Sequence, residues 1–119
     1  MRPIPLLCGL MCLAVSTARA QDPVKVDPTH YKVEFENAQV RVLRIHYGPH
    51  EKGVMHSHPA SVSVFLTDLH GKFTYPNGKT EEVHAKAGEA QWGKAVKHLG
   101  ENMSDNALEL IAVELKGKP

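Results

Sequence analysis

Short runs in which apolar and polar side chains alternate make up most of the chain after position 30. These runs are rich in β-branched and aromatic residues, and Gly, Pro, Asn or Asp separates them at intervals of about eight to twelve residues. None keeps a 3.6-residue period over several turns, so the pattern predicts strands rather than helices. The predicted strands are Tyr31–Glu36, Gln39–Tyr47, Ser61–Thr67, Lys72–Tyr75, Thr80–His84, Glu89–Trp92 and Leu108–Leu115.

No segment is available for the helical crossovers that parallel strands need, so the pattern predicts an all-β sandwich or barrel. Asn77 and Gly78 follow Pro76 between two of the runs, and this pair favours a two-residue hairpin turn. Gly, Asn, Ser and Asp are concentrated in residues 100–106, which predicts a loop there. Residues 21–30 contain two prolines and little periodicity, so we expect an extended arm.

The first twenty residues have the three parts of a secretion signal. Arg2 precedes an uncharged apolar run from Ile4 to Val15, and small residues follow, ending in Ala18-Arg19-Ala20. This run is too short for a permanent transmembrane helix. We therefore expect cleavage after Ala20 and a periplasmic or secreted protein. The expected organisation is a signal peptide (1–20), an arm with the first strand (21–37) and one barrel domain (38–116).

Composition narrows the possible partners. The chain has 119 residues, with 14 Lys and Arg against 13 Asp and Glu, and two cysteines. Removal of the signal peptide takes away Arg2, Arg19 and both cysteines, which leaves 99 residues with twelve basic and thirteen acidic side chains. Such a chain has no basic excess with which to bind nucleic acid or an anionic membrane. It also has no disulfide, so core packing, a metal ion or a second subunit must stabilise the fold.

Several enzyme and regulator classes lack the residues that they need. The mature chain has no cysteine nucleophile and no Gly-x-Ser-x-Gly sequence. It also has no Gly-rich turn between a strand and a helix, as phosphate-binding and dinucleotide-binding enzymes have, and no helix-turn-helix segment. Metal-centred chemistry and plain ligand binding are the classes that are left.

The histidines carry the most informative spacing. All eight follow residue 20, and His56 and His58 are separated only by Ser57. On a strand these two rings project from one face, about 7 Å apart along the chain. A Gly- and Pro-containing turn precedes the pair, and an apolar strand follows it. About forty residues later, after a turn at Gly88, the chain has His98 and Asn102 in a His-x-x-x-Asn pattern.

With these two motifs the chain resembles the cupin superfamily over roughly residues 38–115. The resemblance implies a single small β-barrel of the double-stranded β-helix, or jelly-roll, type. It also implies that His56, His58 and His98 are metal ligands in the barrel mouth, and that Asn102 shapes the loop behind the third ligand. The metal implied is a divalent ion such as Zn, Fe, Mn, Ni or Cu.

The chain departs from the pattern of metal-binding cupins in two places. The Glu that usually follows the second histidine by four or five residues falls here on Val62 or Ser63, and Lys86 replaces a Pro before Gly88. Two interpretations remain open. In the first, three neutral imidazoles bind a divalent ion with open positions for water or substrate. Alternatively, the barrel has lost its metal, and the histidines are polar groups in a ligand cavity.

Other residues receive structural or secondary roles. Ser63 and Gln91 are candidate polar contacts for a ligand, whereas Phe65 and Trp92 are expected in the core or barrel wall. We expect His70 in an exposed turn, and a role as a supplementary ligand is the alternative. His46 is expected to face solvent, and the three remaining histidines are expected at the surface: His30, His50 and His84.

The sequence thus predicts an exported cupin-type barrel that binds a divalent metal and a small molecule. One function is a metal-dependent enzyme of the oxygenase or isomerase type, and the alternative is a non-catalytic barrel that binds a small ligand or metal. A third class, a barrel that serves only as a scaffold, also remains. The resemblance implies a homodimer, and the free edge at Tyr31–Glu36 offers a route to pairing between subunits.

Overall fold

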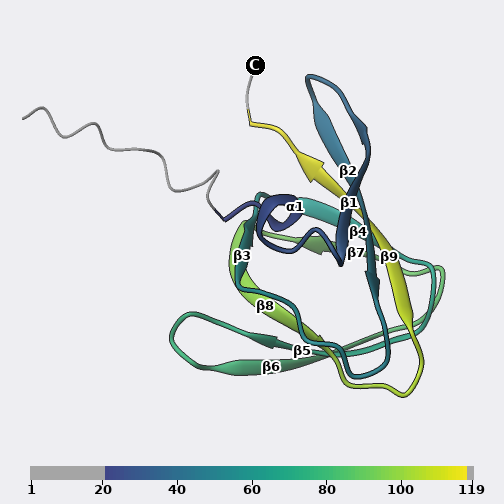
Figure 1. Cartoon of the computed structure of the whole chain (residues 1–119). Helices are drawn as coiled ribbons and strands as arrows, with labels where there is room; N and C mark the ends of the chain where they lie inside the picture. The colour runs from purple at the N-terminus through teal and green to yellow at the C-terminus, as the bar shows by residue number, and fades with distance from the viewer. Residues whose placement is uncertain (1–20, 118–119) are drawn as a thin grey trace, which may run out of the picture.

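The computed structural model describes residues 21–117, so the expected signal peptide lies outside the described residues. Antiparallel strands make up most of this part of the chain (Figure 1). The elements in chain order are α1 (Pro23–Val26), β1 (Tyr31–Glu36), β2 (Val40–Tyr47), β3 (His56–His58), β4 (Ser61–Phe65), β5 (Leu69–Thr74), β6 (Thr80–Ala85), β7 (Ala90–Gly93), β8 (Val96–Asn102) and β9 (Leu108–Leu115).

The strands form two sheets that face each other as a barrel. One sheet has five strands in the order β1-β2-β9-β4-β7, and the other has four in the order β3-β8-β5-β6. Every pairing between these strands is antiparallel, and neighbours in each sheet are often distant in sequence, as with β2 and β9. The predicted all-β jelly-roll barrel is confirmed.

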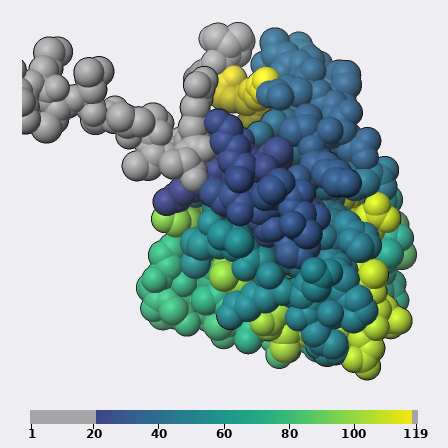
Figure 2. Space-filling view, viewed as in Figure 1, coloured from purple at the N-terminus to yellow at the C-terminus, as the bar shows by residue number. Residues whose placement is uncertain are grey.

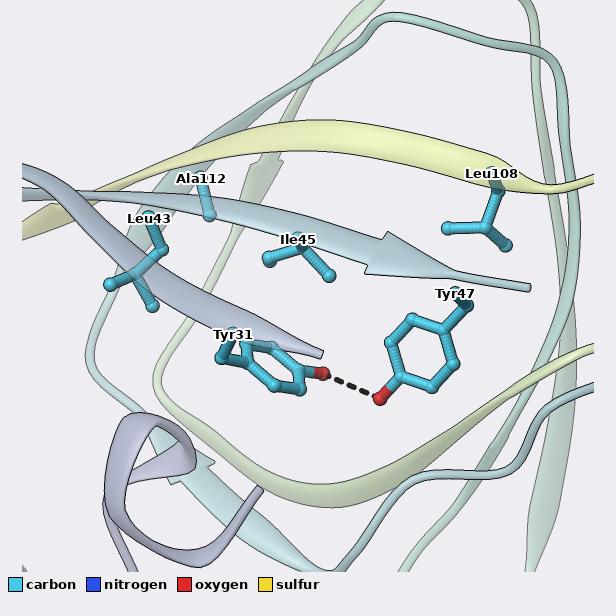
Figure 3. Close-up of a cluster of buried hydrophobic side chains, with 6 residues drawn as sticks. All are labelled: Tyr31, Leu43, Ile45, Tyr47, Leu108 and Ala112. Carbon is cyan, nitrogen blue, oxygen red and sulfur yellow. Dashed lines mark hydrogen bonds between the residues drawn. The ribbon is translucent and has the colours of Figure 1, made fainter. Parts of the chain in front are cut away.

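The main core lies on the inner face of the five-stranded sheet. Along β2 the buried residues Leu43, Ile45 and Tyr47 alternate with the more exposed Arg44 and His46, as a strand with one solvated face requires. Figure 3 shows how they cluster with residues from β1 and β9. The buried cluster is Tyr31, Leu43, Ile45, Tyr47, Leu108 and Ala112.

The predicted hairpin at Asn77-Gly78 is present between β5 and β6. Gly78 has a φ of +82°, a backbone conformation that residues other than glycine rarely adopt. Its N–H donates to the carbonyl of Tyr75 at 2.9 Å. The turn fixes the β5–β6 register, in which His70 lies opposite His84.

The expectation of an extended arm over residues 21–30 is wrong in part, because Pro23–Val26 form a helical turn. Asp22 is the N-cap of this turn, and its side chain accepts a hydrogen bond from the Val24 N–H at 3.0 Å. Pro23 follows as the first residue of the helix, where a proline is well tolerated. The arm lies against β1 and β3, and Figure 2 shows it in purple over the middle of the barrel. Among residues 21–117 no helix is long and apolar enough to cross a membrane.

Two strands were not among the predicted ones. β3 contains only the His-Ser-His segment, and β8 continues through Gly100 to Asn102, so the loop expected over residues 100–106 begins at Met103. Both strands are rich in polar residues, and β8 also contains Gly100 and Asn102, which are residue types with low strand propensity. They pair with each other and β8 also pairs with β5, so long-range hydrogen bonds override local preference.

Candidate metal centre

The three histidines singled out in the sequence meet at the junction of β3 and β8. His56 is the direct register partner of His98, and His58 lies two residues further along the same face of β3. The ring centroids lie 4.6 Å apart for His56 and His58, 5.0 Å for His56 and His98, and 5.3 Å for His58 and His98. One nitrogen from each ring lies within 4.8 Å of the other two, which is close enough for a single ion.

Two of the rings are oriented by hydrogen bonds through Nδ1. His56 Nδ1 donates to the carbonyl of Val54 at 2.6 Å, and His58 Nδ1 donates to Glu114 Oε2 at 2.6 Å. Because Nδ1 is occupied, the Nε2 atom of each ring is the one left to bind a ligand. His56 Nε2 is buried and has no hydrogen-bond partner among the described residues. An unpaired buried nitrogen is costly unless something else binds it.

A buried carboxylate, which the sequence analysis did not identify, supports His58 from behind. Glu114 lies on β9 opposite Ser61 and is only 2% exposed. Its second oxygen accepts from Arg41 Nε at 2.8 Å, and Arg41 in turn donates to Asp22 at 2.7 Å. The usual cupin Glu is missing from β4, yet a carboxylate does reach this site from β9. An acidic residue on the inward face of an otherwise apolar strand was the signal that could have revealed it.

Arg41 forms ion pairs with both Asp22 and Glu114. Hydrogen bonds to Asp22 raise the pKa of Arg41 in spite of its partial burial, and Glu114 adds to the effect. Burial opposes ionisation of Asp22, but the hydrogen bonds from Arg41 and the Val24 N–H outweigh it and lower the pKa of Asp22. A charged carboxylate–guanidinium–carboxylate series therefore links the N-terminal arm to the His58 ring.

Burial keeps His56 and His98 neutral. Desolvation, with a further contribution from the neighbouring His58, lowers the pKa of His56 to about 4. Desolvation and the two other imidazoles lower the pKa of His98 to about 3. Packing also restrains the rings. The His98 ring stacks on Phe73 with 4.2 Å between the ring centroids, and the Tyr31 ring meets His56 edge-on with 4.8 Å between the centroids. Neutral imidazole is the form that coordinates a metal.

A cavity of about 390 Å³ adjoins the triad inside the barrel. His58 and His98 form part of its wall, together with two buried hydroxyl groups, those of Tyr31 and Tyr47, which are hydrogen-bonded to each other at 2.9 Å. The volume is in the range of small-molecule sites. The remaining wall is mostly apolar and aromatic, with Phe65, Phe73 and Leu110 among its residues.

Comparisons with known proteins find similar structures but no match by sequence. No protein-family model matches the chain, and no curated protein matches it. Solved structures do match: a cupin domain from Bordetella pertussis Tohama I superposes with a TM-score of 0.68 at 22% identity, over 73% of this chain and 92% of that one. The chain has the cupin fold.

Two more solved structures agree with this assignment. A double-stranded β-helix protein from Klebsiella pneumoniae has a TM-score of 0.57 at 16% identity, covering 88% of this chain and 91% of its own. The polyketide cyclase RemF from Streptomyces resistomycificus has a TM-score of 0.54 at 17% identity, covering 75% and 66%. The resemblance seen in the sequence is thus confirmed at the level of the cupin fold.

The remaining candidate residues on β4 and β7 differ in how deeply they lie in the barrel. Ser63, Phe65 and Gln91 all line the cavity. Trp92 borders the cavity, as expected for a wall residue, but it is 64% exposed, so the alternative expectation of a core position is wrong. In the sheet register Trp92 lies opposite Val62, next to the inward-facing Gln91, and strand alternation therefore turns its side chain outward.

Asn102 lies behind the triad and ties loops together. It is 1% exposed, and its side-chain amide donates to the carbonyls of Gly48 and Asn106 at 2.9 and 2.8 Å. Its oxygen accepts from the Ser104 N–H at 3.0 Å. In this cupin barrel Asn102 therefore shapes the loop after β8, as the resemblance implied.

The surface position expected for His30 is wrong. His30 is 8% exposed, stacks on Tyr47 at 4.0 Å, and bridges Asp27 and Glu51 through its two nitrogens. The folded arm produces this burial, because it packs against β1 and β3 and places Asp27 against the His30 ring. The other histidines expected at the surface or facing solvent are exposed, namely His46, His50 and His84, whereas His70 is half-buried on β5 rather than in a turn.

Proposed function

We propose that this protein binds one divalent transition-metal ion through His56, His58 and His98 and uses it as an enzyme acting on a small molecule held in the barrel cavity. The observation that carries the proposal is the buried, unpartnered Nε2 of His56, in a cluster in which the Nδ1 atoms of His56 and His58 are already engaged. Three neutral nitrogen donors suit Zn, Fe, Ni or Cu, with Mn a weaker match. When bound, such an ion polarises an oxygen ligand or lowers the pKa of a bound water.

The donor set bears on the class of substrate. None of the three ligands carries a negative charge, so the ion keeps its two positive charges, and Glu114 lies one residue further out, bonded to His58. This arrangement favours an anionic oxygen group on the bound molecule. The aromatic wall of the cavity favours a flat or conjugated carbon skeleton beside that group. The similar fold of a polyketide cyclase is consistent with such a substrate.

The chain's own residues would position the molecule and exclude water. Burial raises the pKa of Tyr31 and of Tyr47, so both phenols stay protonated at neutral pH. One of the two hydroxyl protons is used in the bond between them, which leaves the other for a ligand oxygen. The apolar walls around them keep bulk water away from the reacting group.

One observation favours a non-catalytic barrel as the second candidate. The carboxylate nearest the triad, Glu114, is bonded to both His58 and Arg41, so it is not free to accept a proton from a substrate. A barrel that binds a metal or an anionic ligand without turnover needs no such base. Export, with signal cleavage after Ala20, and a homodimer remain proposals in both versions.

Metal analysis tests the proposal. Protein purified without a histidine tag from its native compartment is expected to hold about one ion in the barrel, and His56→Ala/His98→Ala is expected to lose it. His46→Ala is the matched control, because it removes an exposed histidine outside both histidine clusters. Equal metal content in wild type and the double variant would refute the metal centre.

Turnover separates the two candidates. The metal-loaded protein is incubated with a panel of phenols, keto acids and polyketide-like phenolates, while oxygen consumption and product formation are followed. Turnover that disappears in His98→Ala supports the enzyme. Saturable binding without turnover across the panel supports the non-catalytic barrel.

A further inference from the structure

We propose that His70, Glu82 and His84 form a second site for a divalent transition-metal ion, on the opposite face of the sheet from the cavity. Their neighbours Leu69, Gly71 and Val83 line the barrel cavity. Strand alternation therefore places the three candidate ligands on the outer face. The site is separate from the triad and does not depend on the proposed function.

The hairpin register brings these ligands together. His70 and His84 are direct partners across β5 and β6, and Glu82 precedes His84 by two residues on the same face. The two rings stack at 4.4 Å with an interplanar angle of 14°. Three donor atoms, one from each residue, lie within 4.8 Å of one another.

The spacing fits a shared ion better than it fits direct hydrogen bonds. Glu82 Oε2 lies 3.8 Å from His70 Nε2 and 3.9 Å from His84 Nε2, both too long for a hydrogen bond. Ligand bonds of about 2.0–2.1 Å around a tetrahedral ion put neighbouring ligand atoms roughly 3.4 Å apart. Small rotations of the side chains would therefore bring all three onto one ion.

A second observation points to a ligand at this place. Among residues 21–117, two buried side-chain polar atoms lack a hydrogen-bond partner, His56 Nε2 and His70 Nε2. One lies in each of the two histidine clusters. Within the same residues Glu82 has no lysine or arginine within 4.0 Å, so its charge is available to an ion.

The donor set defines the ion. Two imidazoles and one carboxylate, with at least one open position, suit Zn²⁺, Cu²⁺ or Ni²⁺. Side-chain exposures of 42% for His70 and 65% for both Glu82 and His84 leave the ion accessible from solvent. A reversibly held ion that clips the β5–β6 hairpin is the expected result.

Zinc titration tests the second site. Calorimetry with ZnCl₂ on the mature chain without a tag is expected to give two equivalents if the barrel triad also binds, and one if it does not. His84→Ala is expected to remove one equivalent in either case, whereas His50→Ala, which removes an exposed histidine outside both clusters, is expected to remove none. Failure of the proposed function is seen separately, as a stoichiometry unaffected by His98→Ala.

Glu82→Gln is expected to weaken the same equivalent by about tenfold or more, because the charged ligand is lost. Zinc-induced shifts of the His70 and His84 ring resonances in the wild-type chain give a readout that needs no variant. A stoichiometry that is the same in wild type and His84→Ala, or ring resonances that do not move, would overturn the second site. Equal losses in His84→Ala and His50→Ala would identify non-specific binding to exposed imidazoles, and would overturn it as well.

Discussion

At the scale of single residues, the carboxylate of Glu114 orients one histidine of the triad, which burial alone would not do. It holds His58 through Nδ1 and is itself held by Arg41. A carboxylate in this position fixes the tautomer and raises the basicity of the free ring nitrogen. The sequence motif therefore contains the proposed ligands, and a residue 56 positions away from His58 determines how that ring is oriented.

Glu114→Gln is expected to weaken metal binding by about 10- to 100-fold with little loss of folded protein, because the amide keeps the shape but not the charge. Competition with a chromophoric chelator measures the affinity. Glu109→Gln is the matched control, since Glu109 lies on the outer face of the same strand and pairs with Arg44. Equal affinities for both variants would contradict the role of Glu114.

The two lowered pKa values predict how stability of the metal-free protein depends on pH. His56 and His98 stay neutral in the folded chain down to pKa values of about 4 and about 3, but in the unfolded chain they take up protons near pH 6.5. Since the unfolded state then binds more protons, the free energy of unfolding falls as the pH drops from about 6.5 towards 3.

The expected loss is on the order of 8 kcal/mol across this range, because the pKa values of His56 and His98 lie about 2.5 and about 3.5 below 6.5, and each pKa unit corresponds to about 1.4 kcal/mol. Urea unfolding at a series of pH values measures it. His98→Gln should show a shallower decline between pH 6.5 and 4, because one of the two titrating groups is gone. An identical slope in the variant would mean that other groups cause the decline.

At the scale of elements, the N-terminal arm and β8 close the barrel around the buried tyrosines. The Gly53 N–H donates to the Gly100 carbonyl at 2.8 Å, which joins the loop before β3 to β8. A Cβ at Gly53 would lie 2.3 Å from the Tyr47 hydroxyl and 3.0 Å from Asp27 Oδ2. Side-chain atoms do not approach this closely, so the residue at position 53 must be small.

Gly53→Ala is therefore expected to destabilise the fold by about 1–3 kcal/mol, because Tyr47 is buried and cannot move without disturbing Tyr31 and His30. Thermal unfolding measures the change. Gly93→Ala is the control, since a Cβ there meets its nearest atom at an ordinary 3.5 Å. A change in Gly53→Ala no larger than in Gly93→Ala would show that the loop adjusts freely.

At the scale of the whole molecule, an apolar row crosses the outer face of the five-stranded sheet. The register places one residue of the row on each strand, with Phe35 and Trp92, at 55% and 64% exposure, at the two ends. The row runs Phe35, Val42, Val113, Val62 and Trp92 in the order β1, β2, β9, β4 and β7. An exposed apolar row of this kind suits contact with a second copy of the same face, in which a two-fold axis brings residues of one row against those of the other.

We propose this face, rather than the free edge of β1, as the contact of the expected homodimer, because Lys32, Glu34 and Glu36 put charges along that edge. The proposed homodimer is therefore expected to separate in Phe35→Glu/Trp92→Glu. Light scattering after gel filtration gives the mass. His46→Glu, on the polar end of the same face, should stay dimeric. A monomeric wild type at tens of micromolar would contradict the dimer.

Local patterning in the sequence was enough to predict the strands with alternating side chains and the Asn77-Gly78 hairpin, because each depends on residues a few positions apart. The grouping of His98 with His56 and His58, about forty residues earlier, came instead from the resemblance to the cupin motifs. Only the tertiary structure decided the positions of Glu114, His30 and Trp92. Glu114 reaches His58 because β9 pairs with β4, His30 is buried because the arm folds over the barrel, and Trp92 faces outward because of the β4–β7 register. These depend on which distant strands meet, and hydrophobic periodicity carries no information about strand partners.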